Sequence, residues 1–153
     1  KVLVVVPAFN ESQNIKSVVE SLIQAGYDYV VVNDGSSDDT AKICQEAGFN
    51  LLNPKENLDG HKYALANGYD IDIQFDGDGQ HDVNGIEKLI QEIRNGADLA
   101  IGSRFLEQSD GFKSTLMRRI GIKWLSGTIR LISDLRITDP TSGFRATGHK
   151  ALE

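Results

Sequence analysis

The sequence predicts an α/β domain with a mostly parallel sheet, and two patterns carry that prediction. Short apolar β-branched runs, of which Val2–Val6 is the clearest, have the composition of strands buried on both faces. Between such runs, apolar residues recur at helical spacing, as in Ile15–Ile23 and Ile86–Ile93. Strands that alternate with helices favour right-handed βαβ units, so we expect a three-layer sandwich around a central sheet.

The individual elements follow from these periods and from their boundary residues. Asn10 with Gln13 resembles a capping box before the first helix, and Gly26, Gly48 and Gly96 are typical helix stops. Strands are expected over Val2–Val6, Tyr29–Val32, Phe49–Asn53, Ile71–Phe75 and Asp98–Ile101, and helices over Ile15–Ile23, from Ser36–Asp39 to Glu46, around His61–Ala66 and over Ile86–Ile93.

Length and charge limit the classes of protein to consider. The 153 residues suit one domain, and the net charge of −6 argues against a general nucleic-acid binder. The single cysteine, Cys44, excludes an internal disulfide and reads as a packed core thiol. Lys1 leads directly into an apolar run and nothing closes the chain after Leu152. We therefore expect residues 1–153 to be a single catalytic domain truncated at its C-terminus.

Chemistry-bearing residues follow the expected strands, at the edge where ligands of parallel sheets bind. Asp76 and Asp78 are the clearest case, because two carboxylates one residue apart, with glycines between and after them, can converge on a hard cation. Gln80 and His81 follow within reach as a further oxygen ligand or a diphosphate contact. A plain Asp-Gly turn is the structural alternative.

The loop after the second strand is the next candidate. Asp34 could accept hydrogen bonds from a base or a ribose, as the acidic residue of a dinucleotide fold does. Helix capping is the alternative there, as it is for Asn10 and Glu11. No glycine-rich phosphate loop follows the first strand, which weighs against NAD or P-loop chemistry.

Five segments with such motifs follow one another along the chain: Val5–Glu11, Val32–Thr40, Phe75–His81, Gly102–Phe105 and Asp139–Ala146. Together they resemble the family 2 glycosyltransferases, which have the GT-A fold. The resemblance covers nearly the whole chain, and its last segment is similar to the dolichyl-phosphate mannosyltransferase, or polyprenyl-phosphate glycosyltransferase, branch. One departure is the short stretch Glu56–Lys62, where family members usually carry a longer loop rich in glycine and basic residues.

The resemblance implies roles for individual residues. Asp76 and Asp78, with Gln80, would hold Mg²⁺ or Mn²⁺ on the diphosphate of the donor. Pro7, Ala8 and Glu11 would line the nucleoside pocket, and Asp34 would contact the base. The remaining donor contacts would come from Asn10, Gly35, Gly77 and Lys62, the last a remnant of the shortened basic loop. The sugar would leave a nucleoside diphosphate, UDP or GDP, with inversion.

The acceptor decides which further residues are needed. A sugar hydroxyl needs a general base, for which Asp139 is the candidate, whereas a polyprenyl phosphate needs cations instead. Arg104, Arg118, Arg119 and Arg145 are available to clamp a phosphate. From Leu106 to Arg136 there are six basic residues against three acids, which favours the lipid phosphate. With Asp78 of the metal pair, Asp139 and Arg104 are the expected catalytic residues.

The expected protein is thus a metal-dependent hexosyltransferase of cell-wall or polysaccharide biosynthesis, cytoplasmic and associated with the inner membrane face. The segment Leu116–Ile132 could lie in the membrane interface, although a helix covering the acceptor side is favoured. A membrane surface and a second copy of the chain are candidate partners. Three alternatives stay open: transfer to a sugar hydroxyl of a glycan or glycolipid, a nucleotidylyltransferase, which would need a glycine-rich loop, and a non-catalytic nucleotide-sugar-binding domain.

Overall fold

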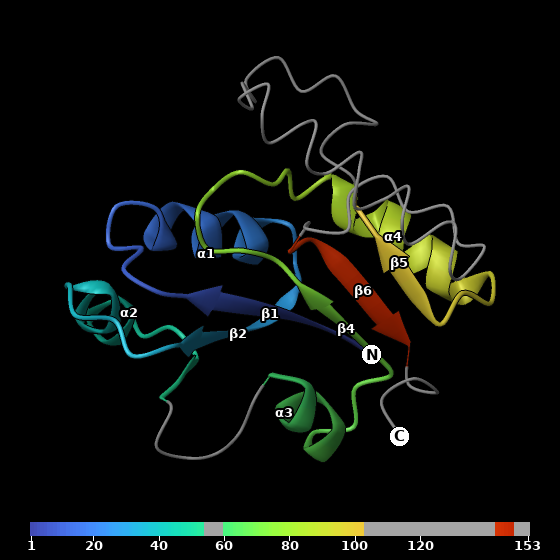
Figure 1. Cartoon of the computed structure of the whole chain (residues 1–153), viewed down its shortest axis with the longest axis horizontal. Helices are drawn as coiled ribbons and strands as arrows, with labels where there is room; N and C mark the ends of the chain where they lie inside the picture. Colours follow the sequence, from blue (N-terminus) through green and yellow to red (C-terminus); the bar gives the residue numbers. More distant parts are fainter. Residues whose placement is uncertain (54–59, 103–142, 149–153) are drawn as a thin grey trace, which may run out of the picture.

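A computed structural model of the protein describes residues 1–53, 60–102 and 143–148, and Figure 1 shows their arrangement. The elements in chain order are β1 (Val2–Ala8), α1 (Ile15–Gln24), β2 (Asp28–Asn33), α2 (Thr40–Glu46), β3 (Leu51–Leu52), α3 (Gly60–Ala66), β4 (Ile71–Gln74), α4 (Gly85–Arg94), β5 (Leu99–Ile101) and β6 (Arg145–Gly148). The predicted α/β class is confirmed, and each predicted strand and helix has a counterpart among these elements.

The sheet has the strand order β3-β2-β1-β4-β6-β5. The pairs of β1 with β2, β1 with β4 and β2 with β3 are parallel, so their carboxyl ends meet at one edge. The strand β6 lies antiparallel between β4 and β5. No local pattern predicted β6, because its place depends on pairing with a strand about 70 residues earlier, Gln74 lying opposite Arg145.

The two faces of the sheet bury different sets of side chains. On one face α1 and α4 pack against alternate residues of β1 and β4, including Val4, Val6 and Ile73, all fully buried. Cys44 of α2 belongs to the same core with its side chain buried, so the predicted core thiol is confirmed. On the other face α3 covers a smaller cluster around Leu3 and Val5. Figure 1 shows α1 and α3 on opposite sides of the sheet.

The capping box predicted at Asn10 and Gln13 is wrong. The helix α1 begins at Ile15 after Asn14, which forms no side-chain cap. Asn10 instead has a φ of 56°, a left-handed conformation that asparagine tolerates better than most residues. Its side chain accepts hydrogen bonds from the next loop rather than from its own helix.

A buried carboxylate on the α3 face was not predicted from the sequence. Asp72, in the middle of β4, is fully buried, and its Oδ2 lies 2.7 Å from Nδ1 of His61 on α3. Neither Asp72 oxygen accepts a well-aligned hydrogen bond within the described residues. His61 is therefore the polar side chain that the structure places against this buried carboxyl group.

Replacing His61 tests how strongly this pair holds α3 on the sheet. We expect His61→Ala to lower the free energy of unfolding by about 1–3 kcal/mol, because the Asp72 carboxylate stays buried without its partner. The double variant His61→Leu/Asp72→Val should recover much of that loss, since apolar groups can replace a buried pair. Urea unfolding curves measure both effects. An unchanged midpoint for His61→Ala would contradict the assignment.

Candidate nucleotide and metal site

The end of β1 is bonded to both neighbouring loops through its backbone. The carbonyl of Ala8 accepts a hydrogen bond from the Asp34 N–H at 2.9 Å, and the carbonyl of Pro7 accepts one from the Gly77 N–H at 3.2 Å. A Cβ at Gly77 would lie 3.2 Å from the Pro7 oxygen, so the two loops pack closely. Pro7, Ala8, Asp34 and Gly77, which the sequence assigned to one donor site, are thus brought together.

Side chains link the loops after β1 and β2 a second time. Oδ1 of Asn10 accepts hydrogen bonds from the backbone N–H groups of Ser37 and Asp38 at 2.8 and 3.3 Å. Two hydrogen bonds run in the opposite direction. Thr40 Oγ1 accepts one from the Glu11 N–H at 2.9 Å, and Asp38 Oδ2 accepts one from the Ser12 N–H at 3.1 Å. Both loops are therefore held in one arrangement, and Asn10 has a structural task whatever else it contacts.

Asp38 takes part in this network as a carboxylate. The Thr40 hydroxyl, which donates to Oδ1 of Asp38, is the main cause that lowers the pKa of Asp38 below its usual range. The backbone N–H of Thr40, the first residue of α2, also donates to Oδ1. Asp38 thus stabilises the loop structure, while the N-cap of α2 is Asp39, which forms no side-chain cap.

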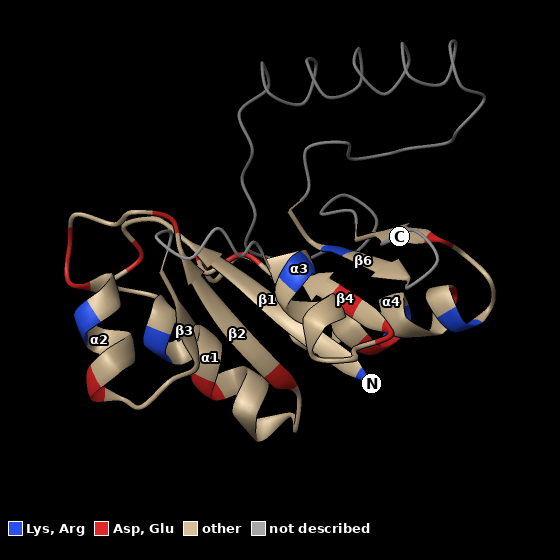
Figure 2. Ribbon diagram, turned by 90° about the horizontal axis from the view of Figure 1, so that it is seen from below, with Lys and Arg blue, Asp and Glu red and all other residues tan. Residues whose placement is uncertain are grey.

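Asp34 differs from Asp38 although both belong to the same acidic loop, which Figure 2 shows leading into α2. Asp34 is exposed, and its carboxylate forms no hydrogen bond or ion pair with the residues that the structure describes. Gly35 next to it has a φ of 74°, a conformation that suits glycine and turns the chain away from the sheet. The Asp34 carboxylate is therefore available to a ligand.

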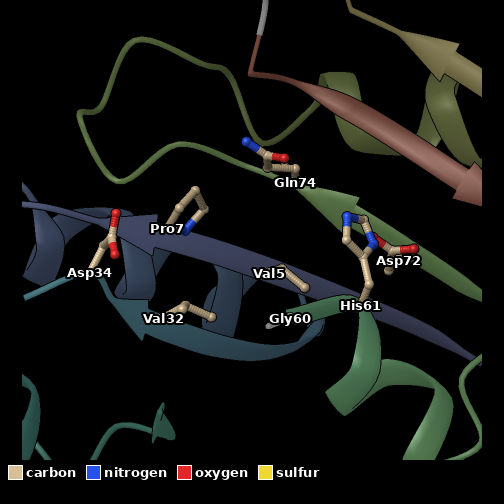
Figure 3. Close-up of a pocket in the computed structure, with 8 residues that line it drawn as sticks. All are labelled: Val5, Pro7, Val32, Asp34, Gly60, His61, Asp72 and Gln74. Carbon is tan, nitrogen blue, oxygen red and sulfur yellow. The ribbon is translucent and has the colours of Figure 1, made fainter. Parts of the chain in front are cut away.

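A cavity of about 210 Å³ lies between this edge of the sheet and α3. It is lined by Val5, Pro7, Val32, Asp34, Gly60, His61, Asp72 and Gln74. Figure 3 shows Asp34 and Pro7 toward one end and the His61–Asp72 pair at the other. Asp76 and Asp78 do not line it, so we assign only the end with Pro7 and Asp34 to the candidate site.

Phe9 lies at this edge and was not predicted from the sequence as a site residue. It follows β1 directly and is 59% exposed, one of the large apolar side chains left uncovered in the described part of the chain. The sequence signal that could have identified Phe9 is an aromatic residue directly after a strand, between Pro7 and Asn10. A flat ring at this position could stack on a base.

Asp76 and Asp78 follow β4, as the sequence predicted. Asp78 Oδ1 accepts a hydrogen bond from the backbone N–H of Gln80 at 2.9 Å, which closes a tight turn around Gly79. The side chain of Asp76 is 31% exposed, and its Oδ2 lies 3.5 Å from Nε2 of His81. The plain Asp-Gly turn is therefore present, and it leaves carboxylate oxygens of both residues at the edge of the sheet.

These residues offer the hard oxygen ligands that Mg²⁺ and Mn²⁺ prefer. Asp76, Asp78 and Gln80 supply two carboxylates and one amide oxygen within five residues. Among residues 1–53, 60–102 and 143–148, no three His, Cys, Asp or Glu side chains gather as a complete metal site. Mg²⁺ commonly takes one or two carboxylates from the protein and further ligands from substrate phosphates and water, and the chemistry of this donor set fits that pattern.

The other predicted residues are divided between described and undescribed parts of the chain. Lys62 is exposed on α3 and does not line the cavity. Arg145 on β6 is exposed, and its guanidinium donates to Oε1 of Gln74 at 2.6 and 3.0 Å. Arg104, Arg118, Arg119, Asp139 and the segment Leu116–Ile132 lie outside the described residues. Within the described ones, no helix is long and apolar enough to cross a bilayer.

Comparison with known proteins gives the family of the chain. Residues 3–153 match the sequence profile described as Glycosyl transferase family 2. The chain is 32% identical over 178 residues to the UDP-N-acetylglucosamine--dolichyl-phosphate N-acetylglucosaminyltransferase of Methanococcus voltae, covering 99% of this chain and 71% of that protein. It is also 32% identical to the dolichol-phosphate mannosyltransferase of Pyrococcus furiosus, covering 100% of this chain and 47% of that protein.

The fold is shared with a solved glycosyltransferase of lower sequence identity. Glucosyl-3-phosphoglycerate synthase from Mycobacterium tuberculosis, in complex with Mn²⁺, UDP-glucose and phosphoglyceric acid, matches with a TM-score of 0.73 and 17% identity. The match covers 98% of this chain and 57% of that protein, so this chain spans little more than half its length. The predicted GT-A fold is confirmed. By its profile match and by relatives at 32% identity, this chain belongs to glycosyl transferase family 2.

Proposed function

We propose that the domain binds a nucleoside diphosphate sugar at the carboxyl edge of β1, β2 and β4 and transfers the sugar to a polyprenyl phosphate. The observation that carries the proposal is the end of β1, whose carbonyls bond the Asp34 loop on one side and the Gly77 turn on the other. The donor would then use the two loops that flank this strand end, with the Asp34 carboxylate for the base and the Asp76–Asp78 pair for the diphosphate.

The nucleoside would occupy the end of the cavity beside Pro7 and Asp34. The Asp34 carboxylate would accept a hydrogen bond from an N–H of the base, while the ring of Phe9 would pack on its face. Glu11 and Asn10 lie in the neighbouring loop, which the hydrogen bonds to Ser37, Asp38 and Thr40 hold in place. The base subsite would therefore be largely formed before the donor binds.

The diphosphate would lie over the turn that contains Asp76 and Asp78. These carboxylates, with Gln80, would hold a divalent cation, which when bound would offset the negative charge on the departing diphosphate. An oxygen of the acceptor phosphate would form a bond to the anomeric carbon as the bond from that carbon to the β-phosphate oxygen breaks. The electron pair would leave with the diphosphate, and attack from the opposite face would invert the anomeric centre.

The choice of acceptor is supported by two observations. Relatives at 32% identity carry the names of dolichyl-phosphate and dolichol-phosphate glycosyltransferases. A phosphate acceptor is already anionic and needs cations rather than a base, and Arg104, Arg118 and Arg119 are assigned to it from the sequence resemblance. Such a reaction would take place at the membrane surface that carries the lipid.

Nucleotide and metal binding test the donor site. We expect isothermal titration to show that UDP or GDP binds much more tightly with Mn²⁺ than without it, because the cation bridges the diphosphate and the carboxylate pair. The variant Asp76→Ala/Asp78→Ala should lose the Mn²⁺-dependent part of the affinity. Asp98→Ala, which removes an exposed acid at the start of β5, serves as the matched control. Equal binding by both variants would refute the metal assignment.

The role of Asp34 is tested by removing its charge alone. We expect Asp34→Asn to weaken nucleotide binding by about 10- to 100-fold, the usual value of a hydrogen bond to a charged group, with the Mn²⁺ dependence retained. Asp39→Asn is the control, since Asp39 is an exposed acid of the same loop at the start of α2. If the two variants bind the nucleotide equally well, Asp34 does not contact the base.

The acceptor is tested by following the sugar. We expect a radiolabelled sugar of the preferred donor to move to a short polyprenyl phosphate in detergent micelles and not to the corresponding free polyprenol. Thin-layer chromatography separates the products. Transfer to a glycan hydroxyl, with none to the lipid phosphate, would replace this acceptor with the hydroxyl alternative and return attention to Asp139 as a base.

A further inference from the structure

The Asp76 carboxylate lies directly against the backbone of Gly143. A Cβ at position 143 would lie 2.0 Å from Oδ2 of Asp76 and 2.4 Å from both Cγ and Oδ1. These distances are far below any contact that a real Cβ makes. The glycine therefore leaves the space that the Asp76 carboxylate occupies, and any side chain at position 143 would force that carboxylate to move.

Phe144, the next residue, is anchored by three neighbours. Its ring is 5.5 Å from that of Phe75 at 90°, an edge-to-face contact. Two glycines make room for it: a Cβ at Gly102 would lie 2.4 Å from the ring, and one at Gly85 2.9 Å. The carbonyl of Phe144 also accepts the Gly102 N–H at 2.8 Å. The backbone of residues 143 and 144 is therefore firmly placed beside the carboxylate.

His81, five residues after Asp76 in the same loop, also lies beside the carboxylate. Only 5% of its side chain is exposed, because the ring packs against Phe144 at 5.1 Å and against Phe75 at 5.9 Å. Its Nε2 is the atom that faces Oδ2 of Asp76, at 3.5 Å. The aromatic contacts fix the orientation of the imidazole, and the imidazole in turn limits where the carboxylate can point.

We propose that Gly143, Phe144 and His81 form a positioning element that sets the orientation of the Asp76 carboxylate toward the divalent cation. This inference rests on the proposed function, because it concerns the same metal. Gly143 and Phe144, which the sequence associated only with a branch of the family, would then position the Asp76 carboxylate. The glycine leaves room for the carboxylate, the phenylalanine holds the histidine ring, and the ring constrains the free rotation of Asp76.

The glycine is tested by adding one methyl group. We expect Gly143→Ala to displace the Asp76 carboxylate and to weaken Mn²⁺ binding, measured by electron paramagnetic resonance with saturating UDP or GDP, by about 10-fold or more. Gly148→Ala is the matched control at the other end of β6, where the added Cβ would meet Ile93 Cγ2 at 3.1 Å. The control should keep the Mn²⁺ affinity of the wild type.

The histidine provides a second variant should Gly143→Ala fail to fold. His81→Phe keeps an aromatic ring between Phe75 and Phe144 but deletes Nε2, so we expect a normal thermal unfolding midpoint with about 10-fold weaker Mn²⁺ binding. His81→Gln, which restores an N–H donor, should recover part of the affinity. A role in packing alone predicts the reverse order, with His81→Phe unaffected.

The outcomes separate this inference from the function it rests on. If the wild type binds no Mn²⁺ with either nucleotide, the proposed metal site fails and the inference fails with it. If the wild type binds Mn²⁺ and both folded variants, Gly143→Ala and His81→Phe, bind it equally well, only the positioning element is refuted. Loss of Mn²⁺ affinity in both, with Gly148→Ala unchanged, supports it.

Discussion

The candidate site depends most on the backbone hydrogen bonds at the end of β1. Pro7 and Ala8 are the last residues of that strand, and each of their carbonyls accepts a bond from a neighbouring loop. Parallel pairing of β1 with β2 and β4 brings the loops to the same edge, and these two bonds extend the pairing beyond the strands. Two loops that are about 40 residues apart in the chain are thus bonded to the end of the same strand.

Acidic residues at this edge carry out different tasks, and their surroundings decide which. Asp38 accepts hydrogen bonds from two loops and stabilises the local structure, whereas Asp34, four residues earlier, is exposed and without a partner in the described part of the chain. Asp72 and Asp76 belong to one strand and the turn after it. Asp72 is fully buried beside His61, while Asp76 reaches the edge with 31% of its side chain exposed. Charge alone would not distinguish these roles.

Most of the fold could be predicted because its signals are local. The apolar run of β1 and the helical stripes of α1 and α4 need no information from distant residues, and the positions of Asp34, Asp76 and Asp78 after strands follow from them. The capping role predicted for Asn10 is wrong because its side chain accepts hydrogen bonds from the next loop instead of from its own helix. The pair of His61 with Asp72 gave no signal either, since a single acid within an apolar strand does not reveal its partner.

The late position of β6 in the chain has a consequence for the order of folding. This strand inserts between β4 and β5, and Arg145 bonds a residue 71 positions before it. Closing so large a loop carries an entropic cost before any contact compensates it, and such pairing slows folding. During synthesis from the N-terminus, β1, β2 and α1 can assemble while the space beside Asp76 is still open. The surroundings of Asp76 would then be among the last parts of the domain to reach their native form. A chain that stops before residue 143 would have the first strands of the sheet but not the Gly143 contact.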